Sequence, residues 1–161
     1  MVSFSLWRIA AETKAYKATD LSGVGAAKYP GRWNAPGEHV VYTATSIPLA
    51  VLETTSHIDS SGLPLNRFLI KIQVPLKVWN AREEADPAEL DPGWSSLPAG
   101  KASVDFGSRW YISRKSALLC VPSVIVPEVR VVLINATHDG ARLITATSIR
   151  PFVYDTLFRR R

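Results

Sequence analysis

The chain has 161 residues, of which 47% are apolar and 20% are charged, close to the average for soluble globular proteins. This length suits one folded domain, taken here as residues 1–161 with a basic tail at 159–161, and the composition argues against a largely disordered chain. The net charge of +5 favours an anionic ligand or partner, although no basic patch is interleaved with aromatic residues as in single-strand nucleic-acid binders.

Targeting signals and metal-binding patterns are not apparent. The N-terminal segment MVSFSLWRIAAETK lacks a basic stretch followed by an apolar core, so we expect no secretion signal. The longest nearly apolar run, 117–127, is shorter than the ~20 residues of a membrane span. The single cysteine, Cys120, is expected to be a small buried strand residue, and the histidines show no metal-ligand spacing with it. These features favour a protein of the reducing cytoplasm, with neither a membrane nor a metal as partner.

The pattern of apolar, glycine and proline residues predicts the secondary structure in chain order. We expect a strand at 3–9, a glycine-rich structured loop at 22–38, a strand at 39–44, a helix at 46–57, a strand at 67–74, an acidic loop at 82–92, a short helix at 105–111, strands at 118–126 and 129–135, and weaker strands at 143–147 and 152–158. The links are short and mostly do not cross the sheet. They therefore predict an α+β fold with a mixed or antiparallel sheet and a few flanking helices.

The helix expected at 46–57 carries a carboxylate among apolar residues. Ser46 is suited to be its N-cap. At 100° per residue, apolar side chains surround the helix axis, so the helix should be largely buried, with Glu53 on an apolar side. A buried carboxylate needs a partner or a task, because desolvating it unpaired costs several kcal/mol. The pattern alone leaves open a structural pair, with His57 or an arginine, and a functional acid.

Two further polar side chains precede this helix. Arg32 lies in a loop between Gly31 and Gly37, where the backbone can approach a ligand and a guanidinium can pair bidentately with phosphate. Tyr42 lies in the following strand. Taken alone, each has a structural alternative, a loop arginine stacked on Trp33 and a core tyrosine. The spacing matches neither a dinucleotide fingerprint nor a P-loop.

Four segments form a series that covers almost the whole chain: 7-WRI-9, 31-GRWNAPGEHVVYTATSIPLAVLETTSHI-58, 118-LLCVPSVIVPEVRVVLINATH-138 and 151-PFVYD-155. In this series the chain resembles the RES-domain proteins, the toxins of RES–Xre toxin–antitoxin modules. The family is named for an arginine, a glutamate and a serine, which here are Arg32, Glu53 and Ser123. The chain departs from the usual pattern in having one glycine before the arginine and ATHDG after Asn135.

The resemblance implies an ADP-ribosyltransferase-like fold that binds NAD+ as its substrate. Members of the family are reported to deplete NAD+ by hydrolysis or phosphorolysis, and at least one relative modifies a protein instead. The acceptor therefore stays open between water, phosphate and a protein, with NAD+ depletion as the leading interpretation. The resemblance also implies a hetero-oligomeric complex with an Xre-family antitoxin. This helix-turn-helix protein would block the active site and make the DNA contact, so we expect no direct nucleic-acid binding by this chain.

The resemblance also implies how the residues share the chemistry. Breaking the nicotinamide–ribose bond passes through an oxocarbenium-like state, which a carboxylate near the sugar stabilises, and we expect Glu53 in this role. Arg32 would hold the diphosphate or the adjacent ribose, and Tyr42 would stack on the nicotinamide ring. Ser123 would hydrogen-bond the substrate or orient the carboxylate. Further candidates for the NAD+ site are Arg8, Tyr29 and Asn34, while His57, one helical turn after Glu53, has either a structural role or an influence on that carboxylate.

Several alternatives stay open at this point. Arg8 has a structural ion pair as its alternative, and Asn34 has a purely loop-shaping role. A basic ribonuclease-type toxin would need a histidine acid and base, whose companions are not visible in the sequence. A non-catalytic binding protein would use Glu53 and Arg32 as a structural pair. The acidic stretch 83–91 is a solvated loop or an antitoxin contact.

Overall fold

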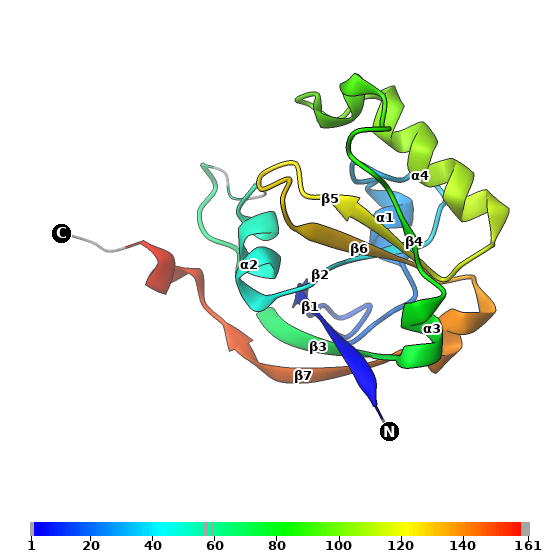
Figure 1. Ribbon diagram of the computed structural model, residues 1–161. Coiled ribbons are helices and arrows are strands. Elements are labelled where there is room, and N and C mark those ends of the chain that lie inside the picture. Colours follow the sequence, from blue (N-terminus) through cyan, green and yellow to red (C-terminus); the bar gives the residue numbers. More distant parts are fainter. Residues whose placement is uncertain (1, 57, 59, 159–161) are drawn as a thin grey trace.

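A seven-stranded sheet organises the computed structural model, which describes residues 2–56, 58 and 60–158 (Figure 1). Its strands are β1 (Ser3–Ala11), β2 (Val40–Ala44), β3 (Arg67–Pro75), β4 (Glu83–Glu84), β5 (Leu118–Pro122), β6 (Arg130–Asn135) and β7 (Thr145–Phe152). The strand order is β4-β5-β6-β2-β1-β3-β7. Neighbouring strands are antiparallel except for the parallel pair of β4 and β5. The predicted α+β fold with a mixed sheet is confirmed.

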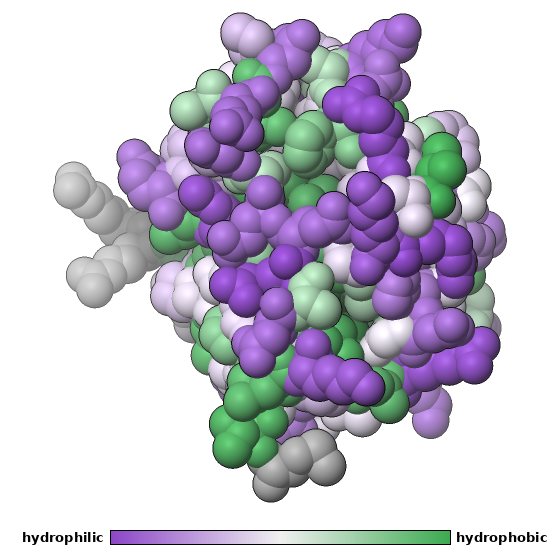
Figure 2. Space-filling view, turned by 45° about the vertical axis from the view of Figure 1, so that its right-hand side comes forward, coloured by the Kyte–Doolittle hydropathy of each residue, from purple (hydrophilic) through white to green (hydrophobic). Residues whose placement is uncertain are grey.

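Short helices cover the sheet and its connections. The α-helices are α1 (Val24–Lys28), α2 (Ile47–Thr55), α3 (Leu76–Asn80) and α4 (Lys101–Ser113), and the 3-10 helices are η1 (Pro92–Ser95), η2 (Asp139–Leu143) and η3 (Tyr154–Leu157). In Figure 1, α2 and α4 lie well apart, with the strands β5 and β6 between them. No helix in the described ranges is long and apolar enough to cross a membrane. The face seen in Figure 2 is mostly polar, with apolar side chains showing as small separate patches.

Most predicted elements are confirmed, with changes at their ends. β1, β2, β3, β6 and α2 begin and end within two residues of the predicted ranges. The glycine-rich loop also contains α1, the acidic loop contains β4, and α4 is longer than the predicted helix at 105–111. β5 ends at Pro122 instead of 126, because the Ser123 hydroxyl accepts hydrogen bonds from the backbone N–H groups of Ile125 and Val126 and the chain bends there.

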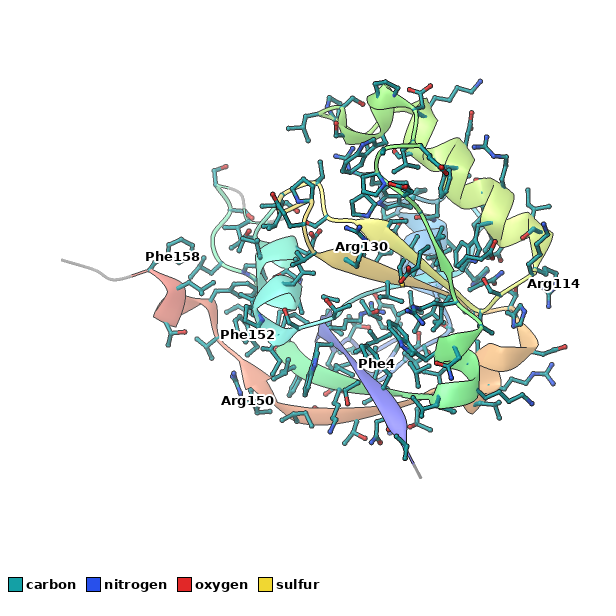
Figure 3. The ribbon with its side chains drawn as sticks, in the orientation of Figure 1. Phe4, Arg114, Arg130, Arg150, Phe152 and Phe158 are labelled. Carbon is teal, nitrogen blue, oxygen red and sulfur yellow. The ribbon has the colours of Figure 1, made fainter. Side chains whose placement is uncertain are left out.

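The prediction for the C-terminal part is wrong. A single strand, β7, takes the place of the weak strands at 143–147 and 152–158, and η3 follows it. The physical reason is Tyr154, which is 2% exposed. Its hydroxyl donates to Oγ1 of Thr54 at 2.7 Å and its ring packs edge-on against Phe152, so burying it turns the chain out of the sheet. Helix α3, which the pattern did not predict, is held where Trp79 stacks on Phe4 of β1 (Figure 3).

Helix α2 is less buried than its apolar sequence predicts. Only Leu49 and Ala50 are buried, while Pro48 is exposed and the other residues of the helix are partly exposed. The helix covers one end of the sheet and turns its inner side to an open space in the molecule. Cys120, in contrast, is buried in β5 as predicted.

The sheet opens between its central strand, β2, and the neighbouring strand β1. β1 pairs with β3 along nine residues, and β2 pairs with β6 along all five of its residues. β1 and β2 themselves meet at one pair, Trp7 and Ala44. Beyond this pair the two strands separate, and the resulting gap exposes side chains of both strands. This gap determines where a ligand can enter the fold.

Candidate active site

A cavity of about 1150 Å³ occupies the gap between β1 and β2. This volume is slightly above the roughly 300–1,000 Å³ typical of ligand and cofactor sites, so the cavity can hold a large ligand. The residues predicted for the site that the structure describes all line this cavity: Arg8, Tyr29, Arg32, Asn34, Tyr42, Glu53 and Ser123. His57 lies outside the described residues. No group of three metal-binding side chains occurs in the described part of the chain.

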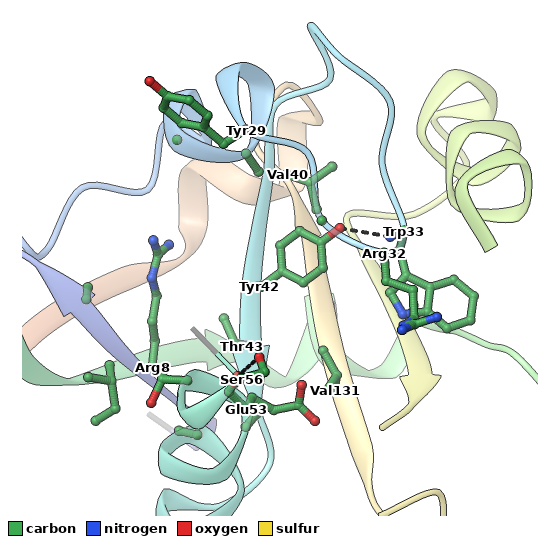
Figure 4. Close-up of a pocket in the computed structure, with 18 of the residues that line it drawn as sticks. Arg8, Tyr29, Arg32, Trp33, Val40, Tyr42, Thr43, Glu53, Ser56 and Val131 are labelled. Atoms are coloured by element: carbon green, nitrogen blue, oxygen red, sulfur yellow. Dashed lines mark hydrogen bonds between the residues drawn. The ribbon is translucent and has the colours of Figure 1, made fainter. Parts of the chain in front are cut away.

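The phase of α2 directs Glu53 into the cavity. Ser46 caps the helix as predicted, with its Oγ accepting a hydrogen bond from the backbone N–H of Leu49 at 3.3 Å. This start places Leu49 and Ala50 against the sheet, and Glu53 follows one turn later on the same side, since residues three and four apart share a helix face. The carboxylate therefore extends from a packed helix face into the cavity (Figure 4).

Ser123 holds the Glu53 carboxylate. Its hydroxyl donates to Oε1 of Glu53 at 2.5 Å, across 70 positions of the sequence. Ser123 is 1% exposed, and its Oγ accepts hydrogen bonds from the N–H groups of Ile125 and Val126, both at 3.1 Å. Because two donors occupy its lone pairs, the hydroxyl proton is directed at Glu53. This geometry corresponds to the second of the two contacts predicted for Ser123, the orientation of the carboxylate.

No arginine or lysine in the described ranges forms an ion pair with Glu53. The carboxylate therefore lacks the structural arginine partner that the sequence left open. Its charge instead acts across the cavity, where it raises the pKa of Arg32 against the stronger lowering effect of burial. A carboxylate held by a hydroxyl and facing an open cavity is suited to stabilise a positive charge that develops on a ligand.

Arg32 lies on the opposite wall, in the loop before β2. Its Nη1 donates to the carbonyl oxygens of Trp94 at 2.9 Å and of Ser96 at 2.8 Å. The neighbouring Trp33 is buried and its ring stacks on that of Trp94, with the centroids 5.9 Å apart. The guanidinium is thus held at one nitrogen while it faces the cavity. No local sequence pattern indicates these two carbonyl partners, which lie more than 60 positions away.

Tyr42 supports this loop from β2. Its hydroxyl donates to Oδ1 of Asn34 at 2.7 Å and accepts a hydrogen bond from the backbone N–H of Trp33 at 3.0 Å. Burial raises the pKa of Tyr42 well above its usual range, so the hydroxyl stays protonated and keeps both contacts. A Cβ atom on Gly31 would lie 2.7 Å from the Tyr42 hydroxyl, which explains the glycine immediately before Arg32.

Asn34 has its amide engaged within the loop. It is 0% exposed, its Oδ1 accepts hydrogen bonds from the N–H of Gly31 and from Tyr42, and its Nδ2 donates to the carbonyl of Ala26 at 2.9 Å. Further donor contacts reach the carbonyl groups of Ala35 and Glu38. Because these bonds occupy both ends of the buried amide, the loop-shaping alternative explains Asn34, and its side chain is not placed to contact a ribose.

Arg8 and Tyr29 complete the predicted set. Arg8 extends from β1 to the side of Tyr42 opposite Arg32 (Figure 4). Burial lowers the pKa of its guanidinium, and the charge of Asp20 partly opposes this effect. Within the described chain Arg8 makes no hydrogen bond and no ion pair within 4.0 Å, so the structural ion pair that the sequence left open is not formed. Tyr29 is 83% exposed at the rim of the cavity.

Residues 5–155 match the model of the RES domain, and the chain therefore belongs to the RES domain family. The resemblance seen in the sequence is confirmed. A protein of Sphingobium sp. (strain YBL2) named "Prs ADP-ribosylating toxin" is 50% identical over 151 residues, which cover 94% of each chain. A protein of Pseudomonas putida named "Toxin Res" is 38% identical over 139 residues, which cover 85% of this chain and 88% of that protein.

The fold also matches a solved structure. The crystal structure of the M. tuberculosis MbcT–MbcA toxin–antitoxin complex contains a chain that superimposes with a TM-score of 0.67, over 97% of this chain and 89% of the other. The sequences are 18% identical, so this similarity concerns the fold alone.

Proposed function

We propose that this chain is the toxin of a toxin–antitoxin pair and transfers the ADP-ribosyl group of NAD+ to a protein. The observation that carries the proposal is the carboxylate of Glu53, held by Ser123 in a cavity that also contains the cations Arg8 and Arg32. The choice of a protein acceptor is supported by the Sphingobium relative, whose name is that of an ADP-ribosylating toxin. Hydrolysis and phosphorolysis of NAD+, which the sequence favours, become the second candidate.

The chemistry begins at the nicotinamide ribose. The bond between C1′ and the nicotinamide nitrogen breaks, its electron pair stays on nitrogen, and nicotinamide leaves as a neutral molecule. Glu53 stabilises the positive charge that develops at C1′ and the ring oxygen. An oxygen or nitrogen nucleophile of the acceptor protein then forms the new bond to C1′ and releases its proton to solvent.

The two arginines and Tyr42 would place the substrate for this step. Arg8 and Arg32 supply positive charge on two sides of the cavity, which suits the two phosphates of NAD+. The ring of Tyr42 lies between them and offers an aromatic face to the cationic nicotinamide. Bound in this way, the reacting carbon would lie near Glu53 before the bond breaks.

The proposal is tested with NAD+ labelled in its adenylate part and with purified Prs, the protein named as the target of the Sphingobium relative, as the acceptor. We expect label in Prs and equimolar free nicotinamide, and a loss of about 10²–10³-fold in rate for Glu53→Gln. The matched control is Glu89→Gln, because Glu89 is an exposed carboxylate outside the cavity. Free labelled ADP-ribose or its phosphate ester, without labelled protein, would establish the second candidate. Intact NAD+ in every reaction would refute both.

An antitoxin partner is part of the proposal. Its support is the fold shared with a chain of a toxin–antitoxin complex. We expect a helix-turn-helix protein of the Xre family, encoded beside this gene, to bind over the cavity in the cytoplasm and to stop NAD+ turnover. Co-expression of the neighbouring reading frame, followed by copurification and assay of the complex, checks this expectation. An active complex would contradict it.

A further inference from the structure

Helix α4 packs against the loop that carries Arg32, residues 31–38. The buried residues of this helix are Ser103, Gly107 and Trp110. They recur every three to four positions and so form one face. On this face the backbone of the helix contacts the backbone of the loop directly. The two backbones are closer together than intervening side chains would allow.

Gly107 makes this close approach possible. A Cβ atom at Gly107 would lie 1.7 Å from the carbonyl oxygen of Trp33 and 2.7 Å from its carbonyl carbon. Glycine is unfavourable in a helix interior, so its presence at this contact has a packing reason. Because the obstacle is backbone and not the end of a flexible side chain, a larger residue must displace the loop itself. Trp33 is the residue next to Arg32, and the displacement would move the guanidinium.

The next residue of α4 holds the other end of the same loop. Ser108 donates its hydroxyl proton to Oε1 of Glu38 at 2.7 Å. The same carboxylate oxygen accepts a hydrogen bond from the backbone N–H of Ala35 at 2.6 Å. Glu38 is only 9% exposed, so these bonds are shielded from water. Two adjacent residues of one helix thus fix both the beginning and the end of the loop.

The segment just before α4 holds the Arg32 side chain. Its carbonyl groups, at Trp94 and Ser96, accept the two hydrogen bonds of Nη1. The Trp33 ring packs against Trp94 from η1 and, at a centroid distance of 6.1 Å, against Phe106 from α4. The continuous segment 92–113 therefore contacts three parts of the loop, which are the Trp33 backbone, the Trp33 ring and the Arg32 guanidinium.

We propose that segment 92–113 is a clamp that orients Arg32 toward NAD+, with Gly107 and Ser108 as positioning residues. The inference rests on the proposed function, in which Arg32 holds the diphosphate. The clamp occupies Nη1 and leaves Nε and Nη2, which make no hydrogen bond within the described chain, for a phosphate oxygen pair. Neither positioning residue is among those that line the cavity, so both act through the loop.

The test compares NAD+ affinity and turnover in variants of the clamp. Affinity is measured by calorimetry in a Glu53→Gln background, which prevents consumption of the ligand, and turnover is measured as nicotinamide release in the Glu53 protein. We expect Ser108→Ala to weaken affinity and to raise KM by about tenfold, since one hydrogen bond to a carboxylate is lost. Ser108→Thr keeps the hydroxyl and should restore both. Gly107→Ala should lower kcat/KM by about 100-fold, the effect of a displacement near 1 Å.

The controls separate positioning from folding. Ser148→Ala on β7 changes an exposed residue outside segment 92–113 and should leave affinity and KM unchanged. A purely structural role lowers the melting temperature of Ser108→Ala without changing NAD+ affinity, and this result would overturn the clamp. If Gly107→Ala does not fold, the NAD+ affinity of Ser108→Ala decides whether the clamp exists. If the wild type leaves NAD+ intact, the proposed function fails, and the affinity of the Glu53→Gln variants still decides whether the clamp exists.

Discussion

The hydrogen bond from Ser123 to Glu53 offers the sharpest test of the site. Replacing Ser123 with alanine removes the donor at 2.5 Å from Oε1 and leaves the carboxylate in place. It also removes the acceptor of the N–H groups of Ile125 and Val126. Two effects follow, one on catalysis and one on the free energy of unfolding, and their sizes can be derived separately.

The catalytic effect comes from the lost orientation of the carboxylate. A hydrogen bond to a charged group contributes about 1.5–3 kcal/mol. At 1.36 kcal/mol for each factor of ten, kcat should fall by about 10–150-fold if the bond serves mainly the transition state. KM should change little, because the bond does not hold the remote parts of NAD+. The two N–H groups left without an acceptor should lower the free energy of unfolding by about 1–3 kcal/mol, or roughly 2–12 °C in Tm.

The assay is nicotinamide release at several NAD+ concentrations, together with thermal unfolding of the same preparation. Ser148→Ala is the matched control, since Ser148 is exposed on β7 and is not among the residues that line the cavity. A folded Ser123→Ala variant with the wild-type kcat would refute the orienting role. A rise in KM at constant kcat would do the same, because it would mean that Ser123 binds the substrate directly.

Four further predictions follow from the same geometry. Arg32→Lys should lower kcat/KM for NAD+ by at least tenfold, because an ammonium cannot keep both carbonyl contacts and a paired contact to phosphate, while the exposed Arg142→Lys should not. Gly31→Ala should raise KM, since its methyl group collides with the Tyr42 hydroxyl, and a wild-type KM would contradict this. Burial raises the pKa of Tyr42 above its unfolded value of about 10, so the contribution of Tyr42 to the free energy of unfolding should be constant below that pH and fall above it, as the unfolded state releases the proton first. Burial also raises the pKa of the Cys120 thiol to about 11, so a thiol reagent at pH 8 should modify it only after denaturation.

The local parts of the site could be predicted from the sequence. The β-branched run before Ala44 predicts β2, and Ser46 marks the start of α2 within one residue. Once that start is known, the helical period alone directs Glu53 to the inner side. The glycine-flanked loop marked Arg32 as a candidate, the family resemblance added Ser123, and the structure brings all three to one cavity.

The contacts between distant segments could not be predicted. Local patterns carry no signal for the separation of β1 from β2, because it depends on how each strand pairs with its other neighbour. The carbonyl groups of Trp94 and Ser96 are backbone atoms, which any residue would supply. Gly107 lies within the stretch predicted as a helix, and no local pattern indicates that its backbone contacts the carbonyl group of Trp33.

The two arginines of the cavity differ in how the protein holds them, and this difference has a consequence for binding. Burial lowers the pKa of both guanidinium groups. Arg32 is already oriented by two carbonyl groups, whereas Arg8 has neither a hydrogen bond nor a close ion pair within the described chain. A partly desolvated cation without a partner gains most from an anion, because the anion replaces interactions that water no longer supplies. Under the proposed function we therefore expect Arg8 to contribute to the affinity for NAD+ alone, and Arg32 to contribute both to the affinity and to the pose of NAD+ beside Glu53.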